Sequence, residues 1–128
     1  MRKLVIPGRL PGLNEAFDAA RRNRHIEAKT RSQCEMLILW AARGCLRGWK
    51  ASGPVILHYT FYEDSRRRDK DNVFGYACKL IHDSLVKGKY LKNDGWADIE
   101  NVTFAWAVDK KRPRIEVEIE EIKKHEEI

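Results

Sequence analysis

The segment RRRDKDN at positions 66–72 concentrates four cations and two carboxylates in seven residues. Hard divalent cations such as Mg²⁺ take oxygen ligands, usually one or two carboxylates, and leave positions open for water and phosphate. Asp69 and Asp71 are two residues apart, so an extended backbone would point both side chains to the same side. The segment therefore has the composition of a metal site beside a phosphate-binding surface. The alternative is that the two aspartates only form a turn or cap a helix.

A third aspartate, Asp94, follows in the next predicted loop. Three convergent carboxylates could hold one metal ion or two, activate water and stabilise charge on a transferring phosphorus. Glu63 and Asp64, at the end of the preceding strand, could join the metal ligands, but a solvated strand end is the favoured interpretation. Four cations flank the pair and would hold neighbouring phosphates: Arg66, Arg67, Arg68 and Lys70.

The overall charge agrees with a polyanionic partner. Lys and Arg total 25 against 19 Asp and Glu, a net charge of +6. Through Ile115 the balance is 23 basic to 13 acidic residues, or +10, because six of the acids lie in the last thirteen residues. Such a field attracts nucleic acid. At 128 residues the chain is expected to form one domain, residues 1–128.

We expect no signal peptide, and no apolar run approaches the ~20 residues of a membrane span. We therefore expect a cytoplasmic protein with no membrane partner. Cys34, Cys45 and Cys78 form no CxxC pair and are odd in number, which favours reduced thiols buried as small apolar groups.

Residue patterns predict an α+β fold of order β, α(α), β, α, β, β. A short strand precedes Pro7, and residues 15–46 are helical with a possible break in the arginine-rich first half. A strand at 55–62 and a helix at about 73–86 follow. The strands at 99–108 and 114–122 are expected to form a hairpin.

The stretch RRRDKDNVFGYACKLIHDSLVKGKYLKNDGWADI, residues 66–99, resembles the RusA family of Holliday junction resolvases of bacteria and their prophages. The family pattern has basic residues, Asp-x-Asp-Asn, a helix carrying Lys-x-x-x-Asp-x-Leu, and an acidic pair ahead of a strand. The early PGLN also resembles the family's Pro-x-x-Asn. The resemblance implies a RusA-like α+β domain in which a small mixed β-sheet packs against two main helices.

By this resemblance, Asp69, Asp71 and Asp94 match the metal-binding catalytic carboxylates, and Lys79 matches the catalytic lysine. Two departures stand out. The acidic pair is Asn93-Asp94, with one carboxylate. Lys79 lies eight residues after Asp71, where the family pattern has four. If the helix is continuous, the extra turn moves Lys79 by about 6 Å and leaves it near the same face. If the extra turn is instead a loop around Gly75, Lys70 or Lys87 becomes an alternative for its role.

The resemblance further implies a homodimer that binds four-way junctions and, with Mg²⁺ or its substitute Mn²⁺, makes paired symmetric nicks in DNA recombination and repair. The expected DNA-binding residues lie in the basic segments and near the carboxylates: Asn14, Arg21, Arg22, Arg24, Arg66, Arg67, Arg68, Lys70 and Asn72. A family nuclease that prefers flaps or forks, a non-catalytic basic nucleic-acid-binding module, and a structural protein are the alternatives.

Several features stay open at the level of sequence. The edge of strand 115–122, the 15–46 helix, or both could form the dimer interface, and the acidic tail at 120–128 could cap a basic surface, contact a second subunit or float free. Trp49 and Trp96 could stack on unpaired bases, although burial against the core is commoner. His25 and His82 are expected to be surface or hydrogen-bonded residues.

Overall fold

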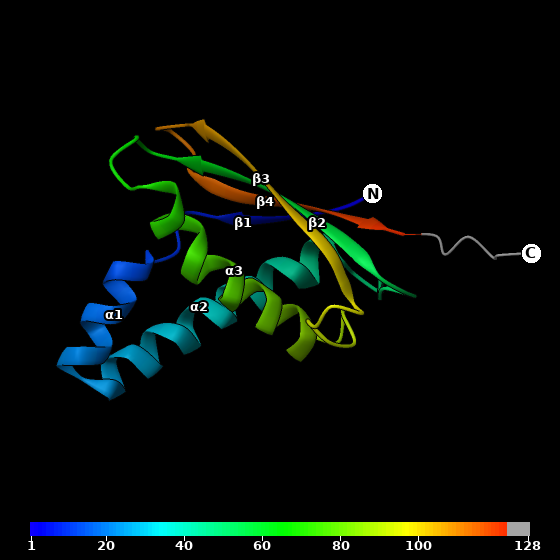
Figure 1. Ribbon diagram of the computed structural model, residues 1–128, viewed down its shortest axis with the longest axis horizontal. Helices are drawn as coiled ribbons and strands as arrows, with labels where there is room; N and C mark the ends of the chain where they lie inside the picture. Colours follow the sequence, from blue (N-terminus) through cyan, green and yellow to red (C-terminus); the bar gives the residue numbers. More distant parts are fainter. Residues whose placement is uncertain (123–128) are drawn as a thin grey trace, which may run out of the picture.

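The computed structural model describes residues 1–122, which form a four-stranded sheet and three helices (Figure 1). The elements are β1 (Arg2–Pro7), α1 (Leu13–Arg22), α2 (Arg24–Cys45), β2 (Val55–Glu63), α3 (Lys70–Lys87), β3 (Ile99–Val108) and β4 (Arg114–Glu121). The α+β class and the element order predicted from the sequence are confirmed. The end of the acidic tail, residues 123–128, lies outside the described residues.

The strand order is β1-β4-β2-β3, so the hairpin expected from the last two strands is wrong. β4 lies between β1 and β2 and is antiparallel to both, whereas β3 is parallel to β2 at the edge. The connection from β2 through α3 to β3 is a crossover, which parallel neighbours require. A short turn such as 109–113 does not force its two strands to pair, and here β2 separates them.

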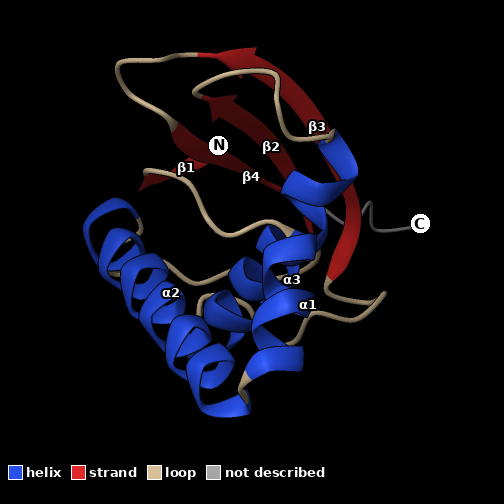
Figure 2. Ribbon diagram, turned by 90° about the vertical axis from the view of Figure 1, so that its left-hand side faces the viewer, coloured by secondary structure: helices blue, strands red, loops and turns tan. Residues whose placement is uncertain are grey.

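The helices cover one face of the sheet (Figure 2). β2 shows why: its residues alternate strictly between buried and half-buried, with Val55, Leu57, Tyr59 and Phe61 facing the helices. Its β-branched and aromatic side chains favour a strand and fill the layer between sheet and helices. β4 contributes Ile115, Val117 and Ile119 to the same layer, as its apolar-acidic alternation predicts.

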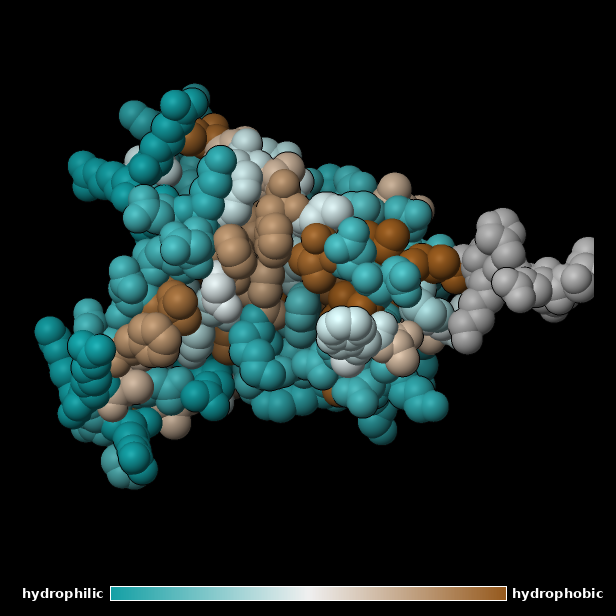
Figure 3. Space-filling model, in the orientation of Figure 1, coloured by the Kyte–Doolittle hydropathy of each residue, from teal (hydrophilic) through white to brown (hydrophobic). Residues whose placement is uncertain are grey.

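The break in the long helical segment falls at Asn23. Its extended backbone ends α1, and its side-chain oxygen accepts a hydrogen bond from the His25 backbone N–H at 2.8 Å, which caps α2. α1 has no buried residue, although α2 and α3 both contact it. Figure 3 shows apolar residues at the surface over α1, at the lower left, among hydrophilic ones.

α3 begins three residues before the predicted start, at Lys70, with Asp69 as its N-cap residue. Ile81 and Leu85 are buried, but Cys78 is only half-buried, although the sequence favoured buried thiols. Cys45 is exposed, so the prediction that all three thiols are buried is wrong. Cys45 is the last residue of α2 and is exposed, although Ala42 before it and Leu46 after it are buried.

The two outer strands decide which sheet edges are free. Both edges of β4 are paired, so the suggestion that its edge forms a dimer interface is wrong. β1 and β3 each have one unpaired edge; β1 packs against α2, whereas β3 is exposed or half-buried along its whole length. None of the helices in residues 1–122 has the length and apolar character needed to cross a membrane.

Candidate active site

The loop from β2 to α3 is held in place by an ion pair between Arg68 and Glu63. Arg68 Nε and Nη2 donate to the two Glu63 carboxylate oxygens at 2.9 and 3.0 Å, and Arg68 Nη1 donates to the Leu10 carbonyl at 3.0 Å. Both charged side chains are nearly buried, 13 and 11 % exposed. Glu63 is therefore an anchor for the loop, and the favoured interpretation of a solvated strand end is wrong for it.

Asp64, its neighbour, is more open. Arg9 Nη1 donates to Asp64 Oδ2 at 3.2 Å, and Arg9 Nη2 lies 3.4 Å from Glu63 Oε1. Arg9 and Arg68 thus converge on the end of β2 from two segments. The sequence suggested that Arg68 holds a phosphate. In the structure its charge is paired with Glu63, so Arg68 positions the loop instead.

Beside this anchor lies a cleft of about 940 Å³. Asp69 and Asp71 line it and are both exposed. Arg66 and Lys70 also line the cleft, and the Lys70 ammonium lies 5.7 Å from the centre of the Trp106 ring, which forms part of the opposite wall. The cleft brings together two carboxylates and two exposed cations, as the composition of 66–72 predicts.

Asp94 and Lys79 do not line this cleft. The reason is the parallel crossover: Asp69 and Asp71 follow the end of β2, whereas Asp94 precedes the start of β3, which pairs with the start of β2. The two loops lie at opposite ends of the sheet, about 25 Å apart for strands of this length. Figure 1 shows the two loops at opposite ends of α3. Lys79 is about 12 Å along the α3 axis from Asp71.

Lys79 belongs to a second group of charges. Its Nζ donates to Asp83 Oδ1 at 3.0 Å, and the two residues form an ion pair four positions apart on α3. The hydrogen bond to Asp83 raises the pKa of Lys79, and Asp94 adds to the effect through space. Burial lowers the pKa of His82, which the same two aspartates partly oppose. The His82 Nε2 atom is buried and has no hydrogen-bond partner in residues 1–122, so the expectation that His82 is satisfied is wrong.

Asn72 joins the starts of two helices. Its side-chain oxygen accepts a hydrogen bond from the Asn14 backbone N–H at 2.8 Å. A Cβ at Gly12 would lie 2.7 Å from Asn72 Nδ2, so the absence of a side chain at Gly12 permits this contact. Asn72 and Asn14 thus fix α1 against the start of α3, next to Asp71. The remaining predicted DNA-binding cations are exposed: Arg21, Arg22, Arg24, Arg66, Arg67 and Lys70.

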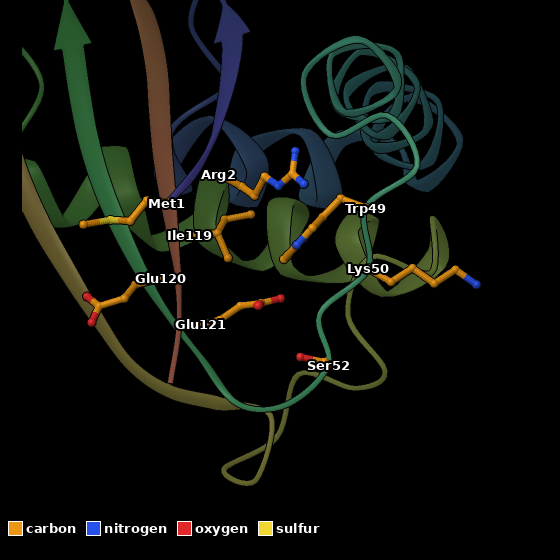
Figure 4. A pocket seen from close by; sticks show the side chains of 8 residues that line it. All are labelled: Met1, Arg2, Trp49, Lys50, Ser52, Ile119, Glu120 and Glu121. Carbon is orange, nitrogen blue, oxygen red and sulfur yellow. The ribbon is translucent and has the colours of Figure 1, made fainter. Parts of the chain in front are cut away.

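The two tryptophans in predicted connectors have opposite environments. Trp49 is 9 % exposed and packs with the core beside a smaller hollow that also involves Ile119, Ser52 and Glu121 (Figure 4). None of the predicted site residues lines that hollow. Trp96 is 95 % exposed, two residues after Asp94, and is free to contact a ligand. Burial, the commoner interpretation, is confirmed for Trp49 and wrong for Trp96.

The cleft offers Mg²⁺ the type of ligand it prefers, but only two carboxylates. Asp69 and Asp71 offer carboxylate oxygens, and Mg²⁺ is usually held by one or two carboxylates with waters completing its ligands. Within residues 1–122, no three acidic, histidine or cysteine side chains gather closely enough to form a metal centre in one chain. Glu63 also lines the cleft, but its carboxylate is bound to Arg68, so a third carboxylate ligand would have to come from another part of the protein.

Sequence reasoning missed the anchoring role of Glu63, although a signal was present. Glu63 is in phase with Val55, Leu57, Tyr59 and Phe61, so strand alternation alone predicts that it points inward. A carboxylate so placed requires a cationic partner. Trp106, which lines the cleft from β3, was missed because only the parallel pairing of β2 with β3 brings it there.

No family model matches the chain, and none of the curated proteins shows significant similarity to it. The function is therefore inferred from the cleft, the charges around it and the resemblance of residues 66–99.

Proposed function

We propose that the protein is a Mg²⁺-dependent endonuclease selective for branched DNA, which resolves four-way junctions by paired symmetric nicks as a homodimer. The observation that carries this proposal is the cleft at the start of α3, where Asp69 and Asp71 are exposed beside Arg66 and Lys70. Carboxylates beside cations serve a metal ion and the phosphates of its substrate together.

Each group in the cleft has a chemical role in phosphodiester hydrolysis. Asp69 and Asp71 hold Mg²⁺, which when bound lowers the pKa of water and stabilises charge on the scissile phosphate. Arg66 in the cleft and its exposed neighbour Arg67 outside it contact the phosphates on either side. Lys70 lines the cleft and stabilises negative charge on the leaving oxygen, the role that the resemblance gave to Lys79.

In the reaction itself, a water oxygen bonds to phosphorus as the bond from phosphorus to one sugar oxygen breaks. The attacking water gives up one proton to solvent and the departing oxygen takes one up, so one water is consumed and a 5′ or 3′ hydroxyl and a phosphate result. The anchored loop of Arg68 and Glu63 keeps Asp69 and Asp71 in place during this step. Correct positioning of such groups accounts for much of the rate enhancement of enzymes.

The unpaired edge of β3 supports a homodimer. An exposed edge strand carries free backbone N–H and C=O groups that pair readily with another strand, and β3 is ten residues long with Phe104 and Val108 39 and 45 % exposed. Two-fold symmetry would pair two copies of β3 antiparallel. The start of one β3 would then lie beside the end of the other.

This arrangement would complete the metal site. Trp106 and Val108, at the end of β3, line the cleft of Asp69 and Asp71. In the antiparallel dimer the loop before the partner's β3 comes to the same place, and it carries Asp94 of the partner subunit. The topology that separates Asp94 from the pair within one chain would bring it there from the second.

Cleavage of labelled DNA tests the function. Wild type and two variants, Asp71→Asn in the cleft and Asp18→Asn on α1, would be incubated with four-way junction, forked, flap and linear duplex DNA, with and without Mg²⁺. We expect paired nicks on the junction, lost without Mg²⁺ and in Asp71→Asn, retained in Asp18→Asn, with junction binding retained throughout. Tight binding without cleavage under any metal would leave a binding module, and cleavage confined to forks or flaps would reassign the substrate.

Mixing two inactive variants tests the shared site. If Asp94 acts across the dimer, a heterodimer of Asp71→Asn and Asp94→Asn chains contains one site with both changes and one intact site. Re-equilibrated mixtures would then recover about a quarter of wild-type nicking, on single strands instead of in pairs. If the site lies within one chain, every site in the mixture is defective and no nicking returns.

A further inference from the structure

α1 is amphipathic, yet its apolar side is not buried by the rest of the chain. Leu13, Ala16, Phe17 and Ala20 follow helical spacing and form one stripe. None of them is buried, and Phe17 is 55 % exposed. Helices of this kind usually bury their apolar stripe, so the stripe has surface available for a partner.

The stripe forms one wall of a groove of about 840 Å³ between α1, α2 and α3. Ala28 on α2 and Tyr76 on α3 contribute further apolar and aromatic surface, and Arg21, Arg24 and Arg31 lie at its rim. Arg31 is neutralised by Glu27, whose carboxylate lies 2.6 Å from its guanidinium. Arg21 and Arg24 are exposed and belong to none of the ion pairs formed within residues 1–122.

The other side of the same helical pair has the opposite character. The hollow there is lined by Glu15, Asp18, Ala19, Arg22 and Ile26, so two acids outnumber its single cation. Ile26 is exposed to the same degree as Phe17, 56 against 55 %. Apolar surface with a net positive charge beside it is therefore a property of the groove and not of the whole helical pair.

The groove begins next to the cleft of Asp69 and Asp71. The Asn14 N–H bonds to Asn72, one residue after Asp71, and a Cβ on Gly75 would meet the Leu13 side chain at 3.3 Å. Tyr76, in the groove, is five residues from Asp71 on the same helix, about 7.5 Å along its axis. A strand of DNA leaving the cleft would therefore reach the groove within a few nucleotides.

We propose that this groove binds an unpaired DNA strand, with bases against Phe17 and the alanines and phosphates on Arg21 and Arg24. Apolar and aromatic surface beneath a line of cations is the arrangement that receives single-stranded nucleic acid, because base faces are exposed only when unpaired. Duplex DNA presents phosphates and groove edges, and would leave the stripe uncovered. The proposal rests on the proposed function and adds to it that the substrate has unpaired nucleotides beside the cut.

Fluorescence anisotropy with a labelled oligothymidine and a blunt duplex of equal length, in EDTA so that no cleavage occurs, tests the groove. We expect Phe17→Ala to weaken binding of the single strand about tenfold or more, and duplex binding less than twofold. Ile26→Ala is the matched control, with equal exposure on the other side, and should leave both affinities unchanged. Equal losses in the two variants, or equal losses on single strand and duplex, would overturn the proposal.

A second pair of variants tests the cations. Arg24→Gln in the groove should weaken single-strand binding and reduce its salt dependence, whereas Arg22→Gln on the other side should do so to a smaller extent. If Phe17→Ala and Arg24→Gln leave single-strand binding unchanged while an acidic amphipathic peptide binds in a Phe17-dependent way, the groove is a protein-docking site and the proposal fails.

The two proposals fail separately. If wild type cleaves junctions but Phe17 has no effect on single-strand binding, the groove proposal is overturned and the endonuclease proposal stands. If wild type binds the single strand through Phe17 and Arg24 but cleaves no DNA, the groove proposal stands and the endonuclease proposal fails.

Discussion

Arg68 binds Glu63, the last residue of β2 and five positions before it, through two hydrogen bonds of 2.9 and 3.0 Å. The pair is nearly buried and also reaches the Leu10 carbonyl, so it connects the loop before α3 to the segment before α1. The exposed Asp69 and Asp71 follow directly. This ion pair thus lies beside the two carboxylates proposed to bind the metal, and it accounts for part of the charge density of 66–72.

Breaking this pair should destabilise the protein. Arg68→Gln leaves the Glu63 carboxylate buried without its main partner, and loss of one member of a buried pair costs about 3 kcal/mol or more of unfolding free energy. Urea unfolding followed by circular dichroism measures the change. Arg66→Gln is the control, since Arg66 is exposed and should change stability by less than about 0.5 kcal/mol. Equal stabilities of the two variants would contradict the anchoring role.

The contact between Gly12 and Asn72 should appear as coupling between two mutations. Gly12→Ala places a Cβ 2.7 Å from Asn72 Nδ2 and should cost about 1 to 3 kcal/mol through crowding. Asn72→Ala removes the acceptor of the Asn14 N–H and should cost about 1 kcal/mol. Because the smaller side chain relieves the crowding, the double variant should be more stable than the sum of the single changes predicts. Additive losses would show that the two residues do not meet.

Local patterns carried most of the fold. The β-branched run at 55–62 and the alternation of 115–121 depend on neighbouring residues, so their strands were predicted within a residue or two. The break at Asn23 was expected without a position, because an Asn cap is visible only when the backbone conformation is known. The inward position of Glu63 follows from the alternation of side chains along β2, but the identity of its partner, Arg68, cannot be predicted in that way.

Pairing between distant segments could not be predicted from such patterns. β3 was expected beside β4, yet it pairs with β2 in parallel, and that choice depends on which sheet edge α3 crosses to. The same choice separates Asp94 from Asp69 and Asp71, although all three belong to one sequence motif. A motif orders residues along the chain, and only topology says which of them meet.

Cysteine reactivity tests the burial of α3 against the sheet. Burial raises the pKa of the Cys78 thiol to about 12 and also raises that of Cys34, whereas Cys45 is exposed. Because the thiolate is the reactive form, iodoacetamide at pH 8 should modify Cys45 first, Cys34 more slowly and Cys78 last. Mass spectrometry of digested samples gives the order. In urea the three rates should converge; modification of Cys78 as fast as Cys45 in the folded protein would contradict this packing.

His82 should make stability depend on pH. Burial lowers its pKa from the ordinary 6.5, and the opposing effects of Asp94 and Asp83 only partly restore it. Below pH 6.5, His82 is therefore protonated in the unfolded chain while it is still neutral in the folded protein. The free energy of unfolding falls as the pH is lowered, until folded His82 is protonated as well. His82→Gln removes this contribution while the carboxylates still titrate. Urea unfolding at pH 7.5 and 5.5 should show a larger loss for wild type than for His82→Gln; equal losses would mean that His82 is as accessible to protons in the folded protein as in the unfolded chain.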